Sequence, residues 1–303
     1  MLAMQHCDLS ILIPTHNDNC LELVKTLLCQ AAVAGFGEYE VLVADDASTS
    51  AIVKEAHAKI NELPHASCTF FCENQGRAKA RNWLADHARY EWLLFLDADG
   101  MPYDENFLSE YRKNATDKND VVVGTPFHPD RCPSPDVSLR WKYEKAAEKR
   151  FTAEKRNLHP FECFRSYCFM IRKELFLNIR FDEHFYSYGY EDTLLGSRLA
   201  EENANVVHIT TRYENKHIET NEIFLEKTET ANVTLKQFYR QLRHNSRLIS
   251  HYEYLRLFGG HFFLAWYYRH FYEGMKRRLC QPNPSVWRYQ WYKICHFCYL
   301  MRQ

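Results

Sequence analysis

The chain lacks the segments that would export it or anchor it in a membrane. Its first residues, MLAMQHCDLSILIP, contain no basic stretch followed by an apolar core, so no secretory signal peptide is predicted. No apolar run reaches the roughly 18 residues that a spanning helix needs. We therefore expect a cytoplasmic protein. Its eleven cysteines are expected to be reduced, because disulfides are rare in that compartment.

The chain also has no excess of charge of either sign. Its 38 Lys and Arg nearly balance 39 Asp and Glu, which leaves a formal net charge of −1. Attraction of the whole protein to nucleic acid is therefore not indicated, and we expect no nucleic-acid partner. Hydrophobic residues make up 46% of the 303 residues and aromatic residues 15%, so the chain can bury a substantial core.

Residues 8–125 alternate between predicted strands and predicted helices. The apolar runs predict strands at Leu9–Ile13, Tyr39–Ala44, Ser67–Phe71, Trp92–Leu96 and Val121–Val123. The segments between them predict helices at Cys20–Ala34, Ala51–Leu63, Gly76–Ala88 and Glu105–Asn114. This rhythm is typical of an α/β fold with a mostly parallel, doubly wound sheet.

The second half of the chain is organised differently. A loop with four prolines is predicted at 126–135, followed by a charged helix from Ser138 to about Lys155. A second ordered region covers Phe161–His208. Beyond Asn221 the pattern is helical to about Arg278, and an aromatic and basic tail follows.

The segment EWLLFLDADGMP carries the most chemical information. Its predicted strand Trp92–Leu96 delivers Asp97 and Asp99 at the carboxyl end, followed by Gly100, which we expect to be flexible. Ligands bind at this edge of open α/β sheets, and two acids there suit a divalent cation that holds phosphate oxygens. A phosphatase of the haloacid dehalogenase type, with Asp97 as nucleophile, is an alternative. So is a plain strand-to-turn junction, where Asp and Gly are common.

The position of the motif disfavours the phosphatase, whose nucleophile normally follows the first strand rather than the fourth. The ends of the other strands, and the start of the helix after the third, carry further candidate residues. They are Pro14, Thr15, Asp45, Asp46, Asn74, Gly76, Arg77, Lys79 and Arg81. A carboxylate can accept from a base N–H or a ribose hydroxyl, and a guanidinium at a helix start suits a diphosphate. Each element alone is also explained by helix capping or a solvated face. Together they favour a nucleotide site.

The segments SILIPTHND, VLVADDAST, NQGRAKARN and WLLFLDADG, in this order, resemble those of family 2 glycosyltransferases. The resemblance implies the GT-A fold, a Rossmann-like, mostly parallel, doubly wound sheet, here with a C-terminal helical extension. It implies a catalytic domain at 1–220, with a nucleotide-binding half at about 1–125 and an acceptor-side half at 126–220. The extension covers 221–303.

The resemblance also implies roles for individual residues. The donor base would meet Pro14, Thr15 and Asp46. Asp97 would lie near the ribose or sugar, and Asp99 would ligate Mn²⁺ or Mg²⁺. Further donor contacts would come from Asp45, Gly76 and Arg81.

An acceptor-side motif follows in MIRKELFLNIRFDEHFYSYGYEDTLLGSRL, which resembles the family block ending in Gly-x-Glu-Asp. A carboxylate there can take the proton of the attacking sugar hydroxyl. Asp192 is the predicted catalytic base, with Glu191 beside it. Capping of the following helix is the alternative role of Asp192. Leu194 stands where the family often has a further acid, which leaves Glu191 or Asp192 as the base.

Two histidines downstream are candidate metal ligands, because imidazole suits a manganese-like ion. His217, in YENKHIETNE, resembles the histidine block of bacterial family members better than His208 does. Either could also be structural. The Cys295–Cys298 spacing has no second pair nearby, so a zinc site is not predicted.

The aromatic and basic C-terminal segment either packs onto the catalytic domain or contacts an anionic membrane peripherally at its inner face. The predicted activity is inverting, metal-dependent transfer of a sugar from a nucleoside-diphosphate sugar to a hydroxyl of a saccharide or lipid-linked acceptor, in surface polysaccharide or glycolipid synthesis. The phosphatase and a non-catalytic sugar- or partner-binding module remain as alternatives. A sugar-phosphate nucleotidyltransferase would carry a Gly-rich basic loop where this chain has THND.

Overall fold

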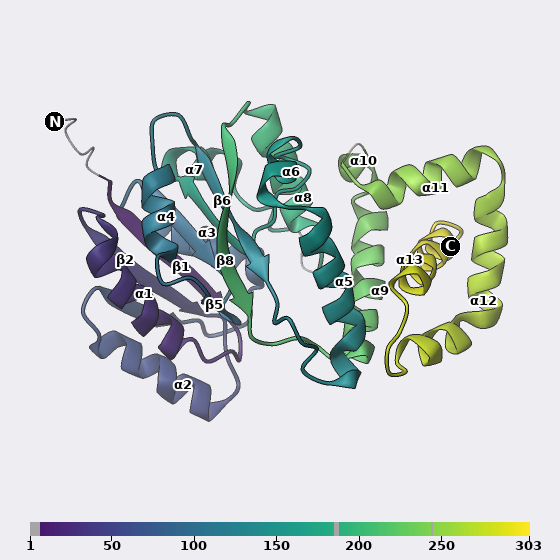
Figure 1. Ribbon diagram of the computed structural model, residues 1–303, viewed down its shortest axis with the longest axis horizontal. Helices are drawn as coiled ribbons and strands as arrows, with labels where there is room; N and C mark the ends of the chain where they lie inside the picture. The colour runs from purple at the N-terminus through teal and green to yellow at the C-terminus, as the bar shows by residue number, and fades with distance from the viewer. Residues whose placement is uncertain (1–6, 185–187, 244) are drawn as a thin grey trace. The chain divides into compact units, whose positions relative to one another are not determined.

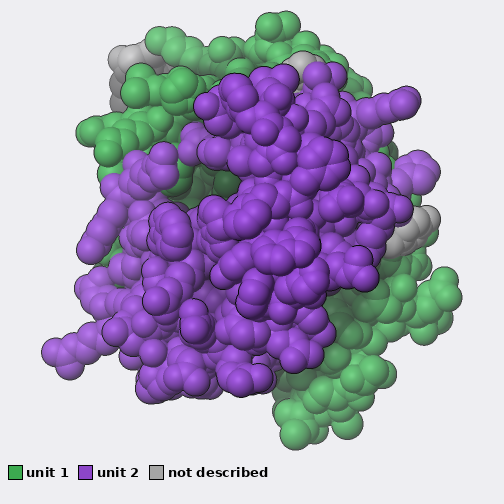
Figure 2. Space-filling view, turned by 90° about the vertical axis from the view of Figure 1, so that its right-hand side faces the viewer, with its two compact units in different colours: residues 1–127, 151–183, 198–217 green, residues 128–150, 184–197, 218–303 purple. Residues whose placement is uncertain are grey.

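The computed structural model describes residues 7–184, 188–243 and 245–303. Residues 1–6 lie outside the described residues; they begin both the predicted catalytic domain and the segment in which a signal peptide was sought. Residues 185–187 of the acceptor-side block also lie outside them. The chain forms two compact units, coloured separately in Figure 2. Unit 1 contains residues 1–127, 151–183 and 198–217, and unit 2 contains 128–150, 184–197 and 218–303.

Unit 1 is built on one eight-stranded sheet with the strand order β3-β2-β1-β4-β7-β6-β8-β5. Its strands are β1 Leu9–Thr15, β2 Tyr39–Asp45, β3 Ala66–Phe70, β4 Trp92–Leu96, β5 Gly100–Pro102, β6 Val121–Phe127, β7 Cys168–Arg172 and β8 Val206–Asn215. The first four strands pair in parallel, and so do β6 and β8. Antiparallel pairs join β7 to β4 and β6, and β5 to β8. The predicted α/β class and the five predicted strands are confirmed.

Helices cover both faces of this sheet, as the predicted double winding requires (Figure 1). Those of unit 1 are α1 Leu21–Ala34, α2 Ala51–Ala58, the 3₁₀ turn η1 Lys59–Glu62, α3 Arg77–His87, α4 Phe107–Asn114, α6 Ala153–Asn157 and α7 Lys173–Ile179. α8, Glu191–Glu201, has its first seven residues in unit 2 and the rest in unit 1. α1 packs beside α4, and α3 packs beside α7.

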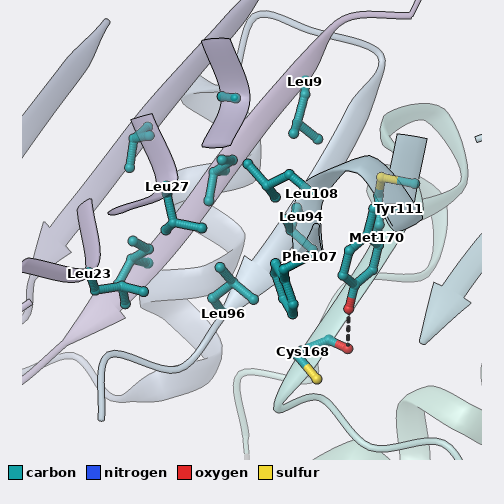
Figure 3. Packing of buried hydrophobic residues seen from close by; sticks show 14 of the residues in the cluster. Leu9, Leu23, Leu27, Leu94, Leu96, Phe107, Leu108, Tyr111, Cys168 and Met170 are labelled. Carbon is teal, nitrogen blue, oxygen red and sulfur yellow. Dashed lines mark hydrogen bonds between the residues drawn. The ribbon is translucent and has the colours of Figure 1, made fainter. Parts of the chain in front are cut away.

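The position of β4 inside the sheet explains why its sequence is an unbroken apolar run. All five of its residues are buried, because alternate side chains enter different helical layers. Leu94 and Leu96 lie in the cluster formed with α1 and α4 (Figure 3). Phe95 packs instead on Phe176 of α7, at 4.8 Å between ring centroids. Burying a side chain of this size stabilises the fold by about 1.5–3 kcal/mol.

A polar contact inside this core joins α4 to β7. The Tyr111 hydroxyl donates to the Cys168 carbonyl at 3.1 Å, drawn as the dashed line in Figure 3. Burial raises the pKa of Tyr111 well above its ordinary value, so the hydroxyl keeps its proton and remains a donor.

Unit 2 is helical in its described part. It contains the 3₁₀ turn η2 Pro135–Val137, α5 Ser138–Arg150, α9 Asn221–Gln237, α10 Tyr239–Leu242, α11 Arg247–Leu257, α12 Gly260–Leu279 and α13 Val286–Leu300. α13 packs against α5, α9, α11 and α12 (Figure 1). The last part of the chain was expected to be a tail, and it is instead the central helix of this unit. Cys295 and Cys298 are buried in its packing.

Two predicted boundaries are wrong. The helix expected from Ser138 to about Lys155 breaks at Phe151, and α6 starts after Thr152, whose extended backbone begins a new helix. The proline loop was expected to include Pro126, but this residue pairs with Tyr213 in the last part of β6. A register irregularity between Val123 and Thr125 precedes it, which is where a strand tolerates proline.

All eleven cysteines lie in the described residues and are free thiols. Among the helices of the described part, none combines the length and the apolar character needed to cross a bilayer. The predicted domain limit near residue 220 stays a prediction. The last change from unit 1 to unit 2 follows His217.

Candidate functional site

The carboxyl ends of β1, β2 and β4 lie side by side at one edge of the sheet in unit 1. The parallel register pairs Thr15 with Asp45, and β4 lies on the other side of β1. Asp97 follows β4 directly at this edge. Parallel pairing thus brings together the strand ends that the sequence singled out, at the place where open α/β sheets bind ligands.

Asp46 connects the ends of three elements at this edge. Its backbone N–H donates to the Thr15 carbonyl at 2.8 Å. Its two carboxylate oxygens accept from the backbone N–H groups of Gln75 and Gly76, at 2.7 and 2.8 Å. Gly76 precedes α3 with φ +88° and ψ 160°, a conformation essentially restricted to glycine. Asp46 and Gly76 therefore fix how α3 starts beside the strand ends.

Asp45 points into the fold instead. One carboxylate oxygen accepts from the Ser48 N–H at 2.7 Å, and the other lies 2.7 Å from His57 Nδ1. Burial alone would raise the pKa of Asp45, but the hydrogen bonds from Ser48 and His57 outweigh it and hold that pKa below its ordinary value.

His57 and Asp45 also approach a thiol. His57 Nε2 lies 3.5 Å from Cys20 Sγ, so the three side chains resemble a Cys–His–Asp nucleophile site. All three are buried, and burial raises the pKa of Cys20 far above its ordinary value. A thiol that keeps its proton and meets no solvent is a packing residue, because the thiolate is the nucleophile.

Arg81 of α3, which is buried, forms an ion pair with the partly buried Asp97. Its Nη2 donates to Asp97 Oδ1 at 2.6 Å, and its side chain is 1% exposed. The guanidinium lies 5.0 Å from the centre of the Phe181 ring. The other two nitrogens, Nε and Nη1, are buried and have no hydrogen-bond partner among the residues that the structure describes. Unused donors of a buried cation suit a further anionic group.

The chain after β8 runs beside Asp99. The Lys216 N–H donates to the Asp99 carbonyl at 3.0 Å, and Gly100 pairs with Asn215. The predicted metal ligands Asp99 and His217 therefore come from adjacent segments. His208 differs, because it is buried inside β8 with Nε2 2.9 Å from the Pro160 carbonyl. Burial lowers the pKa of His208 to about 4, as expected for a histidine kept neutral in the core.

Gly100 is a residue of close packing, and the expectation that it is flexible is wrong. It lies buried in β5, and a Cβ there would stand 2.2 Å from the Tyr213 ring and 2.7 Å from the Tyr167 hydroxyl. The Tyr213 hydroxyl donates to the Asp97 carbonyl at 2.8 Å. Tyr213 therefore holds the backbone that carries both acids, and Tyr167 packs beside Gly100.

Sequence reasoning missed Tyr167 and Tyr213. Burial, followed by the charge of Asp99, raises the pKa of Tyr167 well above its ordinary value, so its hydroxyl stays a neutral donor. That hydroxyl has no hydrogen-bond partner in the described part of the chain. No local pattern marks either residue, since they come from the start of β7 and from β8.

The metal-ligating chemistry of this edge is limited to few side chains. Among residues 7–184, 188–243 and 245–303, no group of three or more His, Cys, Asp or Glu could hold a metal ion. One or two protein ligands with substrate phosphates and waters are the usual way to hold Mg²⁺. Asp99 and His217 are two candidate ligands on adjacent segments, which is the number such a shared site uses and fewer than a dedicated metal cage needs.

The acceptor-side motif lies on a strained turn of unit 2. Gly189 has φ +103° and Tyr190 has φ +68°, and a Cβ on Gly189 would stand 2.8 Å from Cβ of Ala231 in α9. Glu191 starts α8, and Asp192 Oδ1 accepts from the Thr193 N–H at 2.7 Å. Strain of this kind at a turn carrying an acid pair is typical of functional sites. Asp192 and Glu191 thus belong to unit 2, whereas the Asp97–Asp99 segment belongs to unit 1.

Comparison with protein families gives a match to Glycosyl transferase family 2 over residues 10–180. Comparison with curated proteins gives no match. Among solved structures, TarS of S. aureus is similar with a TM-score of 0.51 at 21% identity, covering 79% of this chain and 44% of that chain. Its 1–349 fragment has a TM-score of 0.47 at 23% identity, with 75% and 64% covered. The chain thus spans less than two thirds of either TarS chain.

A mannosyltransferase, PcManGT from Pyrobaculum calidifontis, is similar with a TM-score of 0.55 at 15% identity. The match covers 79% of this chain and 68% of that chain. That protein was solved in complex with GDP-Man and Mn²⁺. At these identities the two matches with TM-scores of 0.51 and 0.55 establish the fold alone.

The packing around Gly100 predicts that Gly100→Ala lowers stability. The added methyl group meets the buried Tyr213 and the partly buried Tyr167. Overpacking of this kind costs about 1–3 kcal/mol. Gly274→Ala is the matched control, because its Cβ meets nothing within 4 Å in α12. Alanine there should stabilise by up to about 1 kcal/mol. Urea unfolding measures both variants, and equal midpoints would contradict the packing argument.

The buried pair of Asp45 and His57 predicts a pH-dependent effect of Asp45→Asn. Because the folded-state pKa of Asp45 is lowered, its ionisation stabilises the fold above the unfolded value of about 3.9. That contribution is lost as pH falls through the folded value. The variant should lose about 1–3 kcal/mol at pH 7, and the gap to wild type should narrow below about pH 4.

Unfolding free energy measured from pH 7 downward tests this expectation. Glu55→Gln serves as control, since Glu55 pairs with Lys59 on an exposed helix face. Such a pair contributes about 0–1 kcal/mol. A gap that stayed constant to low pH would show that shape, and not ionisation, accounts for the role of Asp45.

Proposed function

Since the chain belongs to Glycosyl transferase family 2, we propose that it is a glycosyltransferase that moves a sugar from a nucleoside-diphosphate donor to an acceptor hydroxyl with inversion at the anomeric carbon. The observation that carries the proposal is the edge of unit 1. There the hydrogen bonds of Asp46 to the residues before α3, the Arg81–Asp97 pair and the Asp99 segment converge.

The nucleoside would lie over the ends of β1 and β2. Pro14 and Thr15 end β1, and the Thr15 hydroxyl donates to the Asp18 carbonyl at 2.8 Å. Asp46 keeps lone pairs beyond its two backbone hydrogen bonds, so it can accept from a base N–H. Asp45 is left out of these contacts, because both of its carboxylate oxygens are engaged inside the fold.

The diphosphate would lie next to Arg81 and the Asp97–Asp99 segment. Arg81 holds the Asp97 carboxylate towards the ribose or sugar and adds a positive charge that favours the anionic donor. Asp99 and His217 would hold a divalent cation, Mn²⁺ or Mg²⁺, which when bound neutralises charge on the departing diphosphate. The Mn²⁺ bound in the complex of PcManGT supports a divalent cation in this proposal.

Asp192 would act as the general base. Its carboxylate takes the proton of the acceptor hydroxyl while the acceptor oxygen bonds to the anomeric carbon and the bond to the diphosphate breaks. Direct displacement requires no nucleophilic Ser or Cys. Leu194 has no carboxylate and is buried in the core of unit 2. The base in this proposal is therefore Asp192 or its neighbour Glu191.

The acceptor would be a saccharide or a lipid-linked saccharide, in synthesis of surface polysaccharide or glycolipid. The phosphatase alternative is disfavoured on two grounds. Asp97 is tied to a buried guanidinium, and the family match points to glycosyl transfer. A sugar-binding module without activity would retain donor binding and lack turnover.

Donor binding predicts a metal-dependent gain in stability. Among UDP, GDP, CDP and dTDP, one nucleotide with Mn²⁺ should stabilise the folded protein by about 2.7 kcal/mol at 100 times its dissociation constant. Asp99→Asn should lose this gain, because the metal ligand is gone, whereas Asp117→Asn on the exposed surface should keep it. Thermal unfolding measures the gain. Its absence with every nucleotide would contradict the proposed donor site.

The assignment of the base predicts a separation of binding from turnover. Asp192→Asn should lower the transfer rate by about 10²–10⁴, the usual contribution of a general base, while nucleotide binding stays unchanged. Glu191→Gln should lower the transfer rate less than Asp192→Asn does. Radiolabelled sugar transfer and donor-dependent thermal shifts measure the two quantities. A rate in Asp192→Asn close to wild type would assign the base to another residue.

A further inference from the structure

A cluster of exposed apolar side chains lies where α11 gives way to α12. It consists of Tyr254, Leu257, Phe258, Phe262, Phe263 and Trp266, which are between 48% and 76% exposed. We name these six residues the aromatic corner. Tyr254 contacts Phe258 at 5.3 Å between ring centroids, and Phe263 contacts Trp266 at 6.0 Å. Single exposed apolar residues are ordinary, whereas a contiguous group marks an interaction surface.

The inner faces of these two helices already supply the core of unit 2. Tyr252, Leu264, Ala265 and Tyr268 are buried there. The outer face of α12 nevertheless continues to be apolar, with Phe262 and Trp266 one turn apart and exposed Arg269 following on the same face. Core packing therefore does not explain the aromatic corner.

The charge of this region indicates the chemistry of the partner that would bind it. Residues 239–303 contain eleven Lys and Arg against two Glu, a formal charge of +9. The preceding 238 residues contain the other 27 Lys and Arg against 37 Asp and Glu, a charge of −10. The near-neutral total hides this asymmetry, which indicates an anionic partner for the C-terminal helices. Arg302 lies 5.0 Å from the centre of the Phe262 ring, so positive charge reaches the aromatic corner itself.

We propose that the aromatic corner is a membrane-docking surface that recognises a bilayer with anionic lipid headgroups. Aromatic and Leu side chains insert at the boundary of headgroups and acyl chains, while Arg269, Arg277 and Arg302 attract the lipid phosphates. α12 lies on the bilayer and does not cross it. A second copy of the chain is disfavoured as occupant, because it would bring together two C-terminal segments that each carry a formal charge of +9.

The structure narrows the membrane contact expected from the sequence. The expected segment ran from Phe262 to the C-terminus, but Tyr289, Tyr292 and Phe297 of α13 are buried in unit 2. The surface is therefore formed by α11 and α12. The proposal goes beyond glycosyl transfer and does not rest on the donor chemistry.

Vesicle flotation of the full chain tests the proposal. Wild type should float with phosphatidylcholine vesicles that contain phosphatidylglycerol and should stay unbound with phosphatidylcholine alone. The triple variant Phe258→Ser, Phe263→Ser and Trp266→Ser should bind these vesicles at least about tenfold more weakly than wild type, because it loses the inserted apolar area. Val33→Ser, Ile52→Ser and Leu158→Ser, which remove side chains 74–81% exposed in unit 1, form the matched control and should bind as wild type does.

Charge reversal provides an independent variant. Arg269→Glu with Arg277→Glu should weaken binding about 25-fold or more, from the contribution of each basic residue near an anionic surface. Lys54→Glu with Lys118→Glu is the matched control on exposed positions of unit 1. Nucleotide-dependent thermal shifts should be unchanged in all variants, so that a loss of vesicle binding is distinguishable from a loss of donor binding.

Several outcomes would overturn the proposal. One is wild type that floats with neither vesicle. Another is a corner variant that binds as its control does. A third is self-association, measured by sedimentation, that the corner variant abolishes while wild type ignores vesicles. Binding of single-stranded RNA without vesicle binding would assign the surface to nucleic acid.

Discussion

The ion pair between the buried Arg81 and the partly buried Asp97 is the interaction on which the functional edge of unit 1 depends. A guanidinium that is 1% exposed is costly unless it is paired, and Asp97 supplies the pair at 2.6 Å. The pair ties α3 to the end of β4. Two further nitrogens of Arg81 have no protein partner in the described part of the chain. The same group therefore ties α3 to the end of β4 and places a guanidinium among the carboxylates of this edge.

Around this pair, hydrogen bonds from distant segments fix the backbone instead of leaving it flexible. Asp46 holds the start of α3 through two backbone N–H groups, and Tyr213 holds the Asp97 carbonyl. Gly100 leaves room for two tyrosines. An edge prepared in this way pays little reorganisation cost when a ligand arrives, which is how preorganised sites favour binding and catalysis.

The parts of this structure that could be predicted are those with a local signature. Apolar runs predicted β1, β2, β3 and β4, and parallel winding predicted that their polar ends meet. The adjacent acids Asp45 and Asp46 look equivalent in sequence, yet one is bonded to His57 inside the fold and the other to the loop before α3. Only the three-dimensional arrangement of the partners separates them.

Long-range packing accounts for the features of the structure that the sequence did not predict. Tyr167 and Tyr213 reach Gly100 from segments more than 60 residues away, so no spacing rule could find them. The sequences of α12 and α13 are both aromatic and basic, and neither periodicity nor composition tells which one is enclosed. Enclosure of α13 by four other helices leaves the outer face of α12 exposed. The charge asymmetry between the two parts of the chain, in contrast, can be counted from the sequence.

The central claim is that Asp99 lies where a metal-bound diphosphate is held at the edge formed by β1, β2 and β4. A crystal structure of the protein with a nucleoside diphosphate and Mn²⁺ tests it most directly. The account predicts the ion within about 2–2.5 Å of a carboxylate oxygen of Asp99, and the base next to Thr15 and Asp46. A nucleotide bound elsewhere, or an ion held without Asp99, would contradict it.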